Sequence, residues 1–395
     1  MDLADYTRGA SYVVDATDTT TVVWETVDGM IKSVRRPAAG PWSAPELVGE
    51  SKAAIGSPQV AADDEGNVTA VWRTQRAGFT DGVMAATRPA GAGWSEPVRL
   101  SVDRSDPGQD QGPLGAYHIA LAVSPGGAAV VAWDWGSEDR NRPWRIQSVY
   151  RTPGGAWSKV AEVTHARGNH EPQLAIAADA TVTLLYTRQP LGHPQTVLTR
   201  TRHVGAGWGR ARTVTEKGYA PSLAGDLAGD AAVVFTPDFG RVMARYRRVG
   251  HSWGDARRIS ATGVRTNDDF ALAMNGRGKA LVAMTRRHGP LYLVTRPVHG
   301  PWSAPVRVAD PTDPSPRVTV ALDDAGDTFV GWGTYAVNGV YRPHGGTWTT
   351  PFTISPATAV DVLDSVRSQV APNGDVVVMW EQEDLPLRVR VMTTS

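Results

Sequence analysis

The chain consists of short segments in which apolar and polar residues alternate, the pattern of β-strands with one face in a core. The clearest unit has such a segment at residues 59–62, an Asp- and Gly-containing turn, and further strand-like segments at 68–73 and 83–88. A fourth segment covers 94–100, where Pro97 suits an edge strand because it has no N–H to donate. Four short antiparallel strands, named A to D here, are typical of one blade of a β-propeller. No segment predicts a helix of useful length.

This unit recurs along the whole chain. Strand B of each copy ends in a large residue, at Trp24, Trp72, Trp133, Tyr186, Phe235, Met284, Trp332 and Trp380. A repeat of about fifty residues indicates propeller blades. We therefore expect an all-β fold with a single β-propeller domain over residues 1–395 and eight blades of four antiparallel strands. Seven blades are the alternative. Strand D is found only seven times, so the last blade has three strands or takes its outer strand from elsewhere.

Seven tryptophans mark the start of strand D, each with an arginine six residues earlier. The pairs are Arg36 and Trp42, Arg88 and Trp94, Arg151 and Trp157, Arg202 and Trp208, Arg247 and Trp253, Arg296 and Trp302, and Arg342 and Trp348. Because the spacing is fixed, we expect each guanidinium to pack on its own tryptophan or to cap the local turn. A ring of arginines that binds anions is the alternative.

The segment 88–97 resembles the Asp-box (BNR-type) motif of sialidase-like propellers, Ser-x-Asp-x-Gly-x-x-Trp, which joins the third and fourth strands. The Trp is present in all seven copies and the Gly in five, whereas the Asp position never holds Asp. The resemblance implies a sialidase-like propeller in which the box is a folding element on the face away from the active site. The arginines, general acid and Tyr/Glu pair of that family's substrate site map onto no residues of this sequence.

Composition excludes several classes of function. Lys plus Arg and Asp plus Glu both number 40, so the chain lacks the excess positive charge of a nucleic-acid binder or a polybasic membrane anchor. There is no cysteine, which excludes disulfides and thiolate sites. No apolar run approaches a transmembrane helix, so we expect no membrane insertion. The sequence supports no cofactor and no metal.

Two tryptophans, Trp135 and Trp144, lie outside the repeat, and both belong to the B–C connection of the third blade. This connection is long and polar, and B–C and D–A connections emerge at the same end of a propeller. Aromatic rings beside Asp, Asn and Arg side chains are suited to sugars, whose C–H faces stack while their hydroxyls bind the polar groups. The predicted ligand-binding residues are Asp134, Trp135, Arg140, Arg142, Trp144, His118, His170 and Tyr335. The alternative is that Trp135 and Trp144 pack the long loop against its blade.

Carboxylates at the ends of B strands offer a catalytic alternative. The residue after the strand-B aromatic is Glu25, Arg73, Asp134 or Glu381 in four of the copies. Two carboxylates about 5 to 9 Å apart would suit glycoside hydrolysis. A charged lining of a wet channel is the other interpretation of Glu25, Asp134 and Glu381.

These features lead to one hypothesis and two alternatives. The first is a secreted, non-catalytic, lectin-like propeller that attaches to a glycan or glycoconjugate on a surface. Residues 1–5 do not resemble a signal peptide, so this hypothesis presumes that one is removed. The alternatives are a glycoside hydrolase or lyase of sialidase-like fold, and a platform for protein partners in a larger extracellular assembly.

Overall fold

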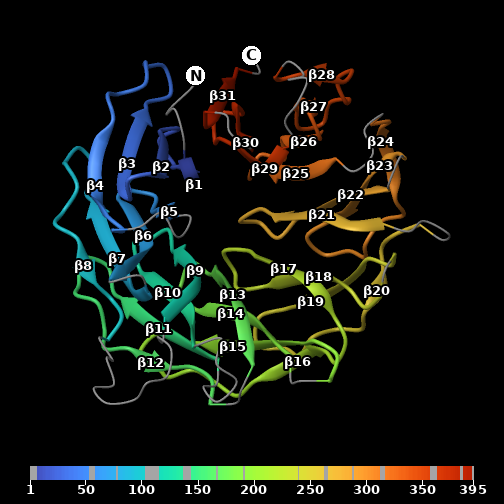
Figure 1. Ribbon diagram of the computed structural model, residues 1–395. Coiled ribbons are helices and arrows are strands. Elements are labelled where there is room, and N and C mark those ends of the chain that lie inside the picture. Colours follow the sequence, from blue (N-terminus) through green and yellow to red (C-terminus); the bar gives the residue numbers. More distant parts are fainter. Residues whose placement is uncertain are drawn as a thin grey trace. The chain divides into compact units, whose positions relative to one another are not determined.

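The structure is a computed structural model. It describes residues 7–52, 58–76, 79–102, 115–136, 144–165, 168–189, 192–238, 240–261, 266–286, 289–311, 316–355, 363–382 and 386–393. Within these residues the chain is all β, with no helix, and its strands form eight antiparallel sheets (Figure 1). These sheets are the blades of a β-propeller, so the predicted fold class is confirmed, with eight blades and not seven.

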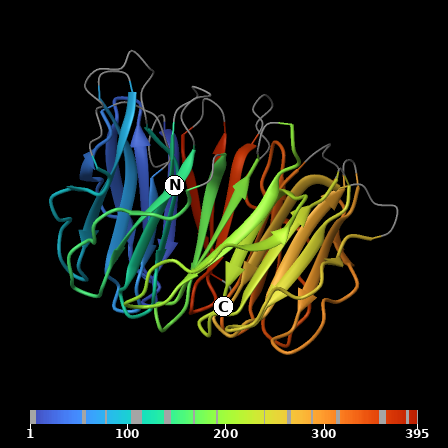
Figure 2. The ribbon, with the colours of Figure 1, turned by 90° about the horizontal axis from the view of Figure 1, so that it is seen from below.

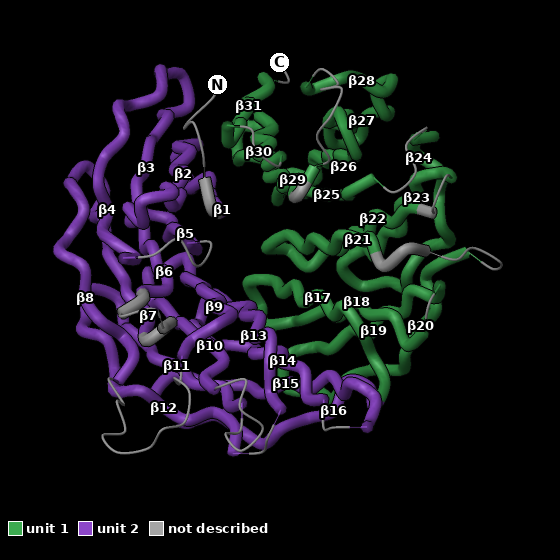
Figure 3. The backbone as a smooth tube through the Cα atoms, in the orientation of Figure 1, with its two compact units in different colours: residues 1–5, 217–395 green, residues 6–216 purple. Residues whose placement is uncertain are grey.

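Residues 6–216 form one of two compact units and contain the first four blades (Figure 3). The first blade consists of β1 (Thr7–Val14), β2 (Thr20–Thr26), β3 (Met30–Arg36) and β4 (Glu46–Glu50). The second consists of β5 (Gln59–Ala62), β6 (Val68–Arg76), β7 (Phe79–Arg88) and β8 (Val98–Arg99). The third consists of β9 (Gly115–Val123), β10 (Ala129–Gly136), β11 (Arg145–Arg151) and β12 (Ala161–Glu162). The fourth consists of β13 (Asn169–Ile176), β14 (Val182–Arg188), β15 (Thr196–Arg202) and β16 (Arg212–Thr215).

The described blades of the other unit lie within residues 217–395. The fifth blade consists of β17 (Tyr219–Gly225), β18 (Ala231–Thr236), β19 (Met243–Arg247) and β20 (Arg257–Arg258). The sixth consists of β21 (Thr266–Met274), β22 (Ala280–Arg286), β23 (Leu291–Arg296) and β24 (Val306–Ala309). The seventh consists of β25 (Arg317–Leu322), β26 (Thr328–Gly333), β27 (Asn338–Arg342) and β28 (Phe352–Thr353). The eighth has three described strands, β29 (Leu363–Val370), β30 (Val376–Gln382) and β31 (Arg388–Met392).

Strand order within each sheet follows the chain, as the hairpin turns predict. In seven sheets all four predicted strands are present. The last sheet has three described strands, which fits the sequence prediction that strand D and its tryptophan occur only seven times. The strands of each blade run side by side between its two ends (Figure 2). The second strand is the most buried, and every residue of β10, β18 and β26 is buried. Neighbouring strands cover its edges and neighbouring blades cover its faces, which explains its continuous apolar sequence.

The core lies in the seams between consecutive blades of each unit. One cluster joins Val71 and Val83 of the second blade to Val131 and Trp133 of the third. Equivalent clusters lie in the other seams within the two units. The repeated tryptophans contribute to these seams, as Trp302 does against the fifth blade. The repeated tryptophan is therefore a packing residue between blades.

The repeated arginines stack in two ways. Arg151, Arg247 and Arg342 lie over their own tryptophans, 4.9, 5.2 and 4.8 Å from the ring centroids, which confirms the predicted packing for these three. Arg202 and Arg296 differ.

The Arg202 guanidinium lies 4.0 Å from the ring centroid of Tyr150, and that of Arg296 lies 3.2 Å from the ring centroid of Tyr246. Each tyrosine belongs to the preceding blade. These two arginines therefore join neighbouring blades, a role that spacing within one repeat could not predict.

Candidate functional site

Asp134 is the centre of a cluster of polar and aromatic side chains in the third and fourth blades. It lies in β10, directly after Trp133, and is fully buried. Its carboxylate accepts hydrogen bonds from the backbone N–H and the Nδ1 of His118, both at 2.7 Å, and from the backbone N–H of Glu171 at 3.3 Å. The Nδ1 of His170 lies 3.7 Å from the same carboxylate. A buried carboxylate surrounded by donors is held in one position.

Irregular strand pairing brings these donors to Asp134. The register between β9 and β10 shifts beside this residue. The register between β13 and β14 shifts between His170 and Gln173, where Glu171 adopts a φ of 56°. That conformation is uncommon for a residue with a side chain, and bulges of this kind redirect backbone groups. The bulge therefore turns the Glu171 N–H toward the carboxylate.

The cluster shifts the ionisation of its members. Burial alone would raise the pKa of Asp134, but the hydrogen bonds from His118 and the nearby His170 ring outweigh it and hold that pKa well below its usual range. The hydrogen bond to Asp134 raises the pKa of His118, although partial burial opposes the shift. The His118 side chain is 60% exposed. It therefore presents an oriented imidazole to solvent while Asp134 stays ionised beneath it.

An aromatic group lies next to this polar cluster. The ring of Trp144 meets Tyr117 edge-on, with centroids 4.6 Å apart at 71°, and its centroid lies 4.9 Å from that of His170. Trp144 also covers Gly136, where an added Cβ would lie 2.6 Å from the indole. Its carbonyl accepts the backbone N–H of Asn169 at 3.3 Å. Trp144 is only half-buried, so the group offers an apolar surface fixed from several sides.

Arg73 supplies a cation on the neighbouring second blade. Burial lowers its pKa, and the charges of Glu25 and Asp134 act in the opposite direction. Within the described residues, the Arg73 guanidinium makes no hydrogen bond and no ion pair within 4 Å, and a guanidinium has five N–H donors to offer. Glu25 is fully buried and accepts the Ser51 hydroxyl. Both carboxylates thus favour the charged form of Arg73 without occupying its donors.

The structure brings four of the predicted residues together, namely Asp134, His118, His170 and Trp144. Trp135 is only 7% exposed and packs in the core between the second and third blades. The expectation that its ring meets a ligand does not fit this position, and the alternative of packing describes it. Arg140 and Arg142 lie outside the described residues.

Tyr335 and Glu381 belong to the other compact unit. Tyr335 is 40% exposed, and its carbonyl accepts the Gln382 side chain at 3.4 Å. Glu381 accepts the Ser365 hydroxyl at 2.7 Å through Oε2, while its Oε1 is buried and has no partner among the described residues. Glu25, Asp134 and Glu381 are thus all held by other groups of the fold.

Tyr117 and Arg73 were not among the predicted ligand-binding residues. Tyr117 contacts the Trp144 ring, and the charge of Asp134 acts on Arg73. Alternation along β10 could have separated Trp135 from Asp134, because successive strand residues point to opposite faces. No sequence signal showed that Glu171 offers its backbone N–H and not its carboxylate.

The described part of the chain shows neither a cluster of metal-ligating side chains nor a membrane-spanning helix. Its His, Asp and Glu side chains form no group of three or more with the arrangement of a metal site. Its residues form no helix long and apolar enough to cross a membrane.

No family model and no curated protein sequence matches this chain. Among solved structures, it is similar to the BP39L lectin from Burkholderia pseudomallei, with a TM-score of 0.62, 14% identity, and coverage of 89% of this chain and 100% of the lectin. It is also similar to the polysaccharide lyase Uly1, with a TM-score of 0.51, 8% identity, and coverage of 85% and 89%. The intramolecular trans-sialidase from Ruminococcus gnavus matches with a TM-score of 0.43, 11% identity, and coverage of 85% and 94%.

These similarities concern the fold. No family match supports the Asp-box resemblance seen in the repeat. A lectin and a lyase both share the fold with this chain, at sequence identities of 14% and 8%. Function therefore has to be argued from the site.

Proposed function

We propose that this protein is a lectin-like, carbohydrate-binding β-propeller whose site is the Asp134 cluster. The observation that carries the proposal is the half-buried Trp144 ring, fixed against Gly136 and Tyr117 and placed beside the oriented imidazole of His118. A sugar has an apolar C–H face and a rim of hydroxyls. A fixed aromatic surface bordered by polar groups is complementary to both features.

Preorganisation supports binding at this cluster. Asp134 holds His118 and His170, and the Trp144 ring packs on both His170 and Tyr117. Side chains that are already fixed lose little conformational entropy when a ligand arrives. A weakly interacting ligand such as a sugar gains most from a site of this kind.

The charge of the site favours a ligand rich in hydrogen-bond acceptors. Arg73 has guanidinium donors that no described residue occupies, and the exposed His118 ring has a second nitrogen beside the one bound to Asp134. Glu25 and Asp134 are buried and do not face the ligand as free acceptors. Hydroxyl and carboxylate oxygens of a glycan would meet these donors.

Affinity for immobilised glycans tests the proposal. Trp144→Ala removes the aromatic surface, and we expect binding to a glycan array to weaken about tenfold or more, since one buried aromatic ring contributes about 1.5 to 3 kcal/mol. His118→Gln removes the imidazole and should also weaken binding. His251→Gln is the matched control, because the exposed His251 side chain forms no hydrogen bond or ion pair within the described residues.

The outcome is clear in either direction. Loss of binding in Trp144→Ala and His118→Gln, with retention in His251→Gln, supports the site. Equal binding by all three variants and the wild type would refute it. Attachment to a glycan-bearing surface and secretion are parts of the same proposal, and detection of the protein in the culture supernatant of its native host would test them.

One observation favours a second candidate function, a polysaccharide-cleaving enzyme. A buried carboxylate that orients an exposed imidazole is the arrangement of a general acid or base. The proton would then be carried by His118, with Asp134 fixing the ring, and not by the buried carboxylates of Glu25, Asp134 or Glu381. Product release from labelled neutral and uronate-containing polysaccharides tests this candidate. Turnover by the wild type that is lost in His118→Gln would establish it, and binding without turnover would exclude it.

A further inference from the structure

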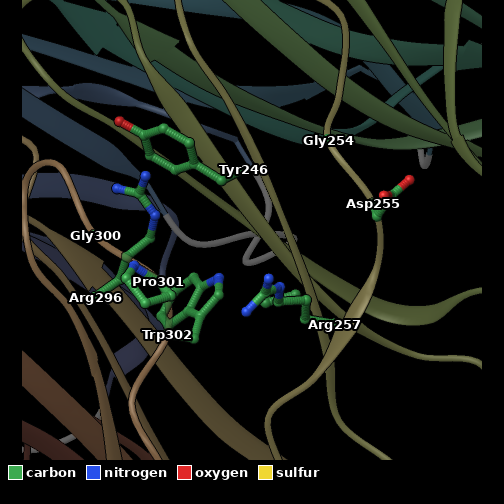
Figure 4. Close-up of a pocket in the computed structure, with 9 residues that line it drawn as sticks. Tyr246, Gly254, Asp255, Arg257, Arg296, Gly300, Pro301 and Trp302 are labelled. Carbon is green, nitrogen blue, oxygen red and sulfur yellow. The ribbon is translucent and has the colours of Figure 1, made fainter.

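A pocket of about 310 Å³ lies between the fifth and sixth blades, far along the chain from the Asp134 cluster. Ala244, Tyr246 and Arg257 of the fifth blade line it, together with Arg296 and Trp302 of the sixth. Figure 4 shows the Trp302 ring flanked by the two arginine side chains, with Tyr246 above Arg296. Its volume is at the lower end of the range of about 300 to 1,000 Å³ for small-molecule sites, the size for one sugar ring.

The pocket can be compared with two other seams between blades, because each seam has residues at equivalent positions of the repeat. Ser33 and Ser148 each lie nine residues before the tryptophan of their own repeat, and Ala244 lies nine before Trp253. The Ser33 hydroxyl accepts the indole N–H of Trp94 at 2.8 Å.

The Ser148 hydroxyl accepts the indole N–H of Trp208 at the same distance. In the seam between the fifth and sixth blades the hydroxyl is missing, since Ala244 takes its place. The indole N–H of Trp302 forms no hydrogen bond within the described residues. An acceptor that the first and third blades provide themselves is therefore open to a ligand here.

A second hydrogen-bond acceptor of the first seam, a carboxylate, also has no counterpart at the equivalent position in the pocket. In the seam of the first two blades, Glu46 lies four residues after the repeat tryptophan and forms an ion pair of 3.3 Å with Arg88. At the corresponding position the fifth blade has Arg257, and the partner of the sixth blade is Arg296. A carboxylate facing an arginine has thus become a second arginine.

The two arginines of the pocket differ in their contacts. Arg296 is buried over the Tyr246 ring, and among the described residues its guanidinium forms only long hydrogen bonds, of 3.3 and 3.4 Å, to the carbonyls of Pro297 and Val298. The Arg257 side chain is exposed and forms no hydrogen bond or ion pair within the described chain. Asp255 also lines the pocket, but no ion pair joins it to either arginine, and its carboxylate points away from them in Figure 4.

We infer that this pocket binds an acidic monosaccharide unit, a hexuronate. Its carboxylate takes the place that Glu46 occupies in the first seam, between Arg257 and Arg296. A ring hydroxyl takes the place of the Ser33 hydroxyl and accepts the Trp302 N–H. The C–H face of the sugar covers the indole. This site is separate from the Asp134 cluster, so either can fail without the other.

An NMR titration of the whole protein with sodium D-glucuronate tests the site, because this method detects millimolar affinities. The decisive variant is Ala244→Ser combined with Arg257→Glu, which restores the residues that the first seam contains. We expect it to fold at least as stably as the wild type and to bind glucuronate at least tenfold more weakly, since it supplies both acceptors internally. Arg257→Gln alone should also weaken binding.

Three controls define the interpretation. Trp144→Ala should keep full glucuronate affinity, which separates this pocket from the proposed glycan site. D-glucose should bind more weakly than glucuronate because it lacks the carboxylate, and acetate because it lacks the ring. Unchanged glucuronate affinity in the double variant, affinity lost in Trp144→Ala, or equal affinity for acetate would each overturn the inference.

Discussion

Replacing Asp134 by Asn tests the organisation of the proposed glycan site most directly. The substitution keeps the shape of the side chain but removes the charge and replaces one carboxylate oxygen by a donor. The groups around the carboxylate are themselves donors, namely the backbone N–H groups of His118 and Glu171 and the His118 ring. One amide hydrogen of the Asn would therefore face another donor in a buried place.

The magnitude follows from the bonds that are lost. A hydrogen bond to a charged group contributes about 1.5 to 3 kcal/mol, and a buried donor left without a partner costs about 1 to 3 kcal/mol. The bond to the His118 ring belongs at the low end, because that side chain is 60% exposed and screened by water. We expect Asp134→Asn to lower the free energy of unfolding by about 2 to 4 kcal/mol.

The loss should depend on pH in a defined direction. The pKa of His118 is raised in the folded protein, so its stabilising contribution is complete below the unfolded value of about 6.5 and disappears as pH rises through the folded pKa. The pKa of Asp134 is lowered, so its contribution is complete above about 3.9 and disappears only as pH falls through its folded pKa. Wild type and variant should differ most between about pH 4 and 6.5.

Urea unfolding at pH 5.5 and pH 8.5 provides the measurement. Asp64→Asn is the control for a change of net charge, because Asp64 is exposed in a turn and its side chain forms no hydrogen bond or ion pair within the described residues. An equal loss of stability at both pH values would show that the charges of Asp134 and His118 are not coupled. A loss no larger than that of the control would refute the whole account of the cluster.

Two further substitutions test the aromatic surface and the seams. Gly136→Ala adds a Cβ only 2.6 Å from the nearest Trp144 ring atom, so the indole must move. Glycan-array binding should therefore fall several-fold, with a shift in tryptophan fluorescence. Unchanged binding would mean that the position of the ring is unimportant. Ser33→Ala removes the acceptor of the Trp94 N–H and should lower the free energy of unfolding by about 1 kcal/mol in urea, whereas no loss would contradict the comparison between seams.

The fold could be predicted in considerable detail because it depends on local patterns. Alternation gave the strands, turn residues gave the hairpins, and the eight strand-B residues gave the number of blades. The stacking of Arg151 on Trp157 could be predicted from a fixed spacing within one repeat. The stacking of Arg296 on Tyr246 could not, because it joins two repeats across a seam.

The candidate site was predicted only in part. The sequence marked the region of Asp134, Trp135 and Trp144 because these residues depart from the repeat. It could not show that Trp135 packs in the core while Trp144 remains half-exposed. It also could not show that a bulge turns the Glu171 N–H toward Asp134.

The sequence by itself therefore determined the architecture of this protein, and the tertiary structure decided its chemistry. Blades are local units whose periodicity is written in every repeat. The proposed binding groups, such as His118 with His170 or Arg257 with Arg296, come from different strands or blades. Their distances depend on how the strands pair and how the blades pack, and no spacing along the chain encodes them.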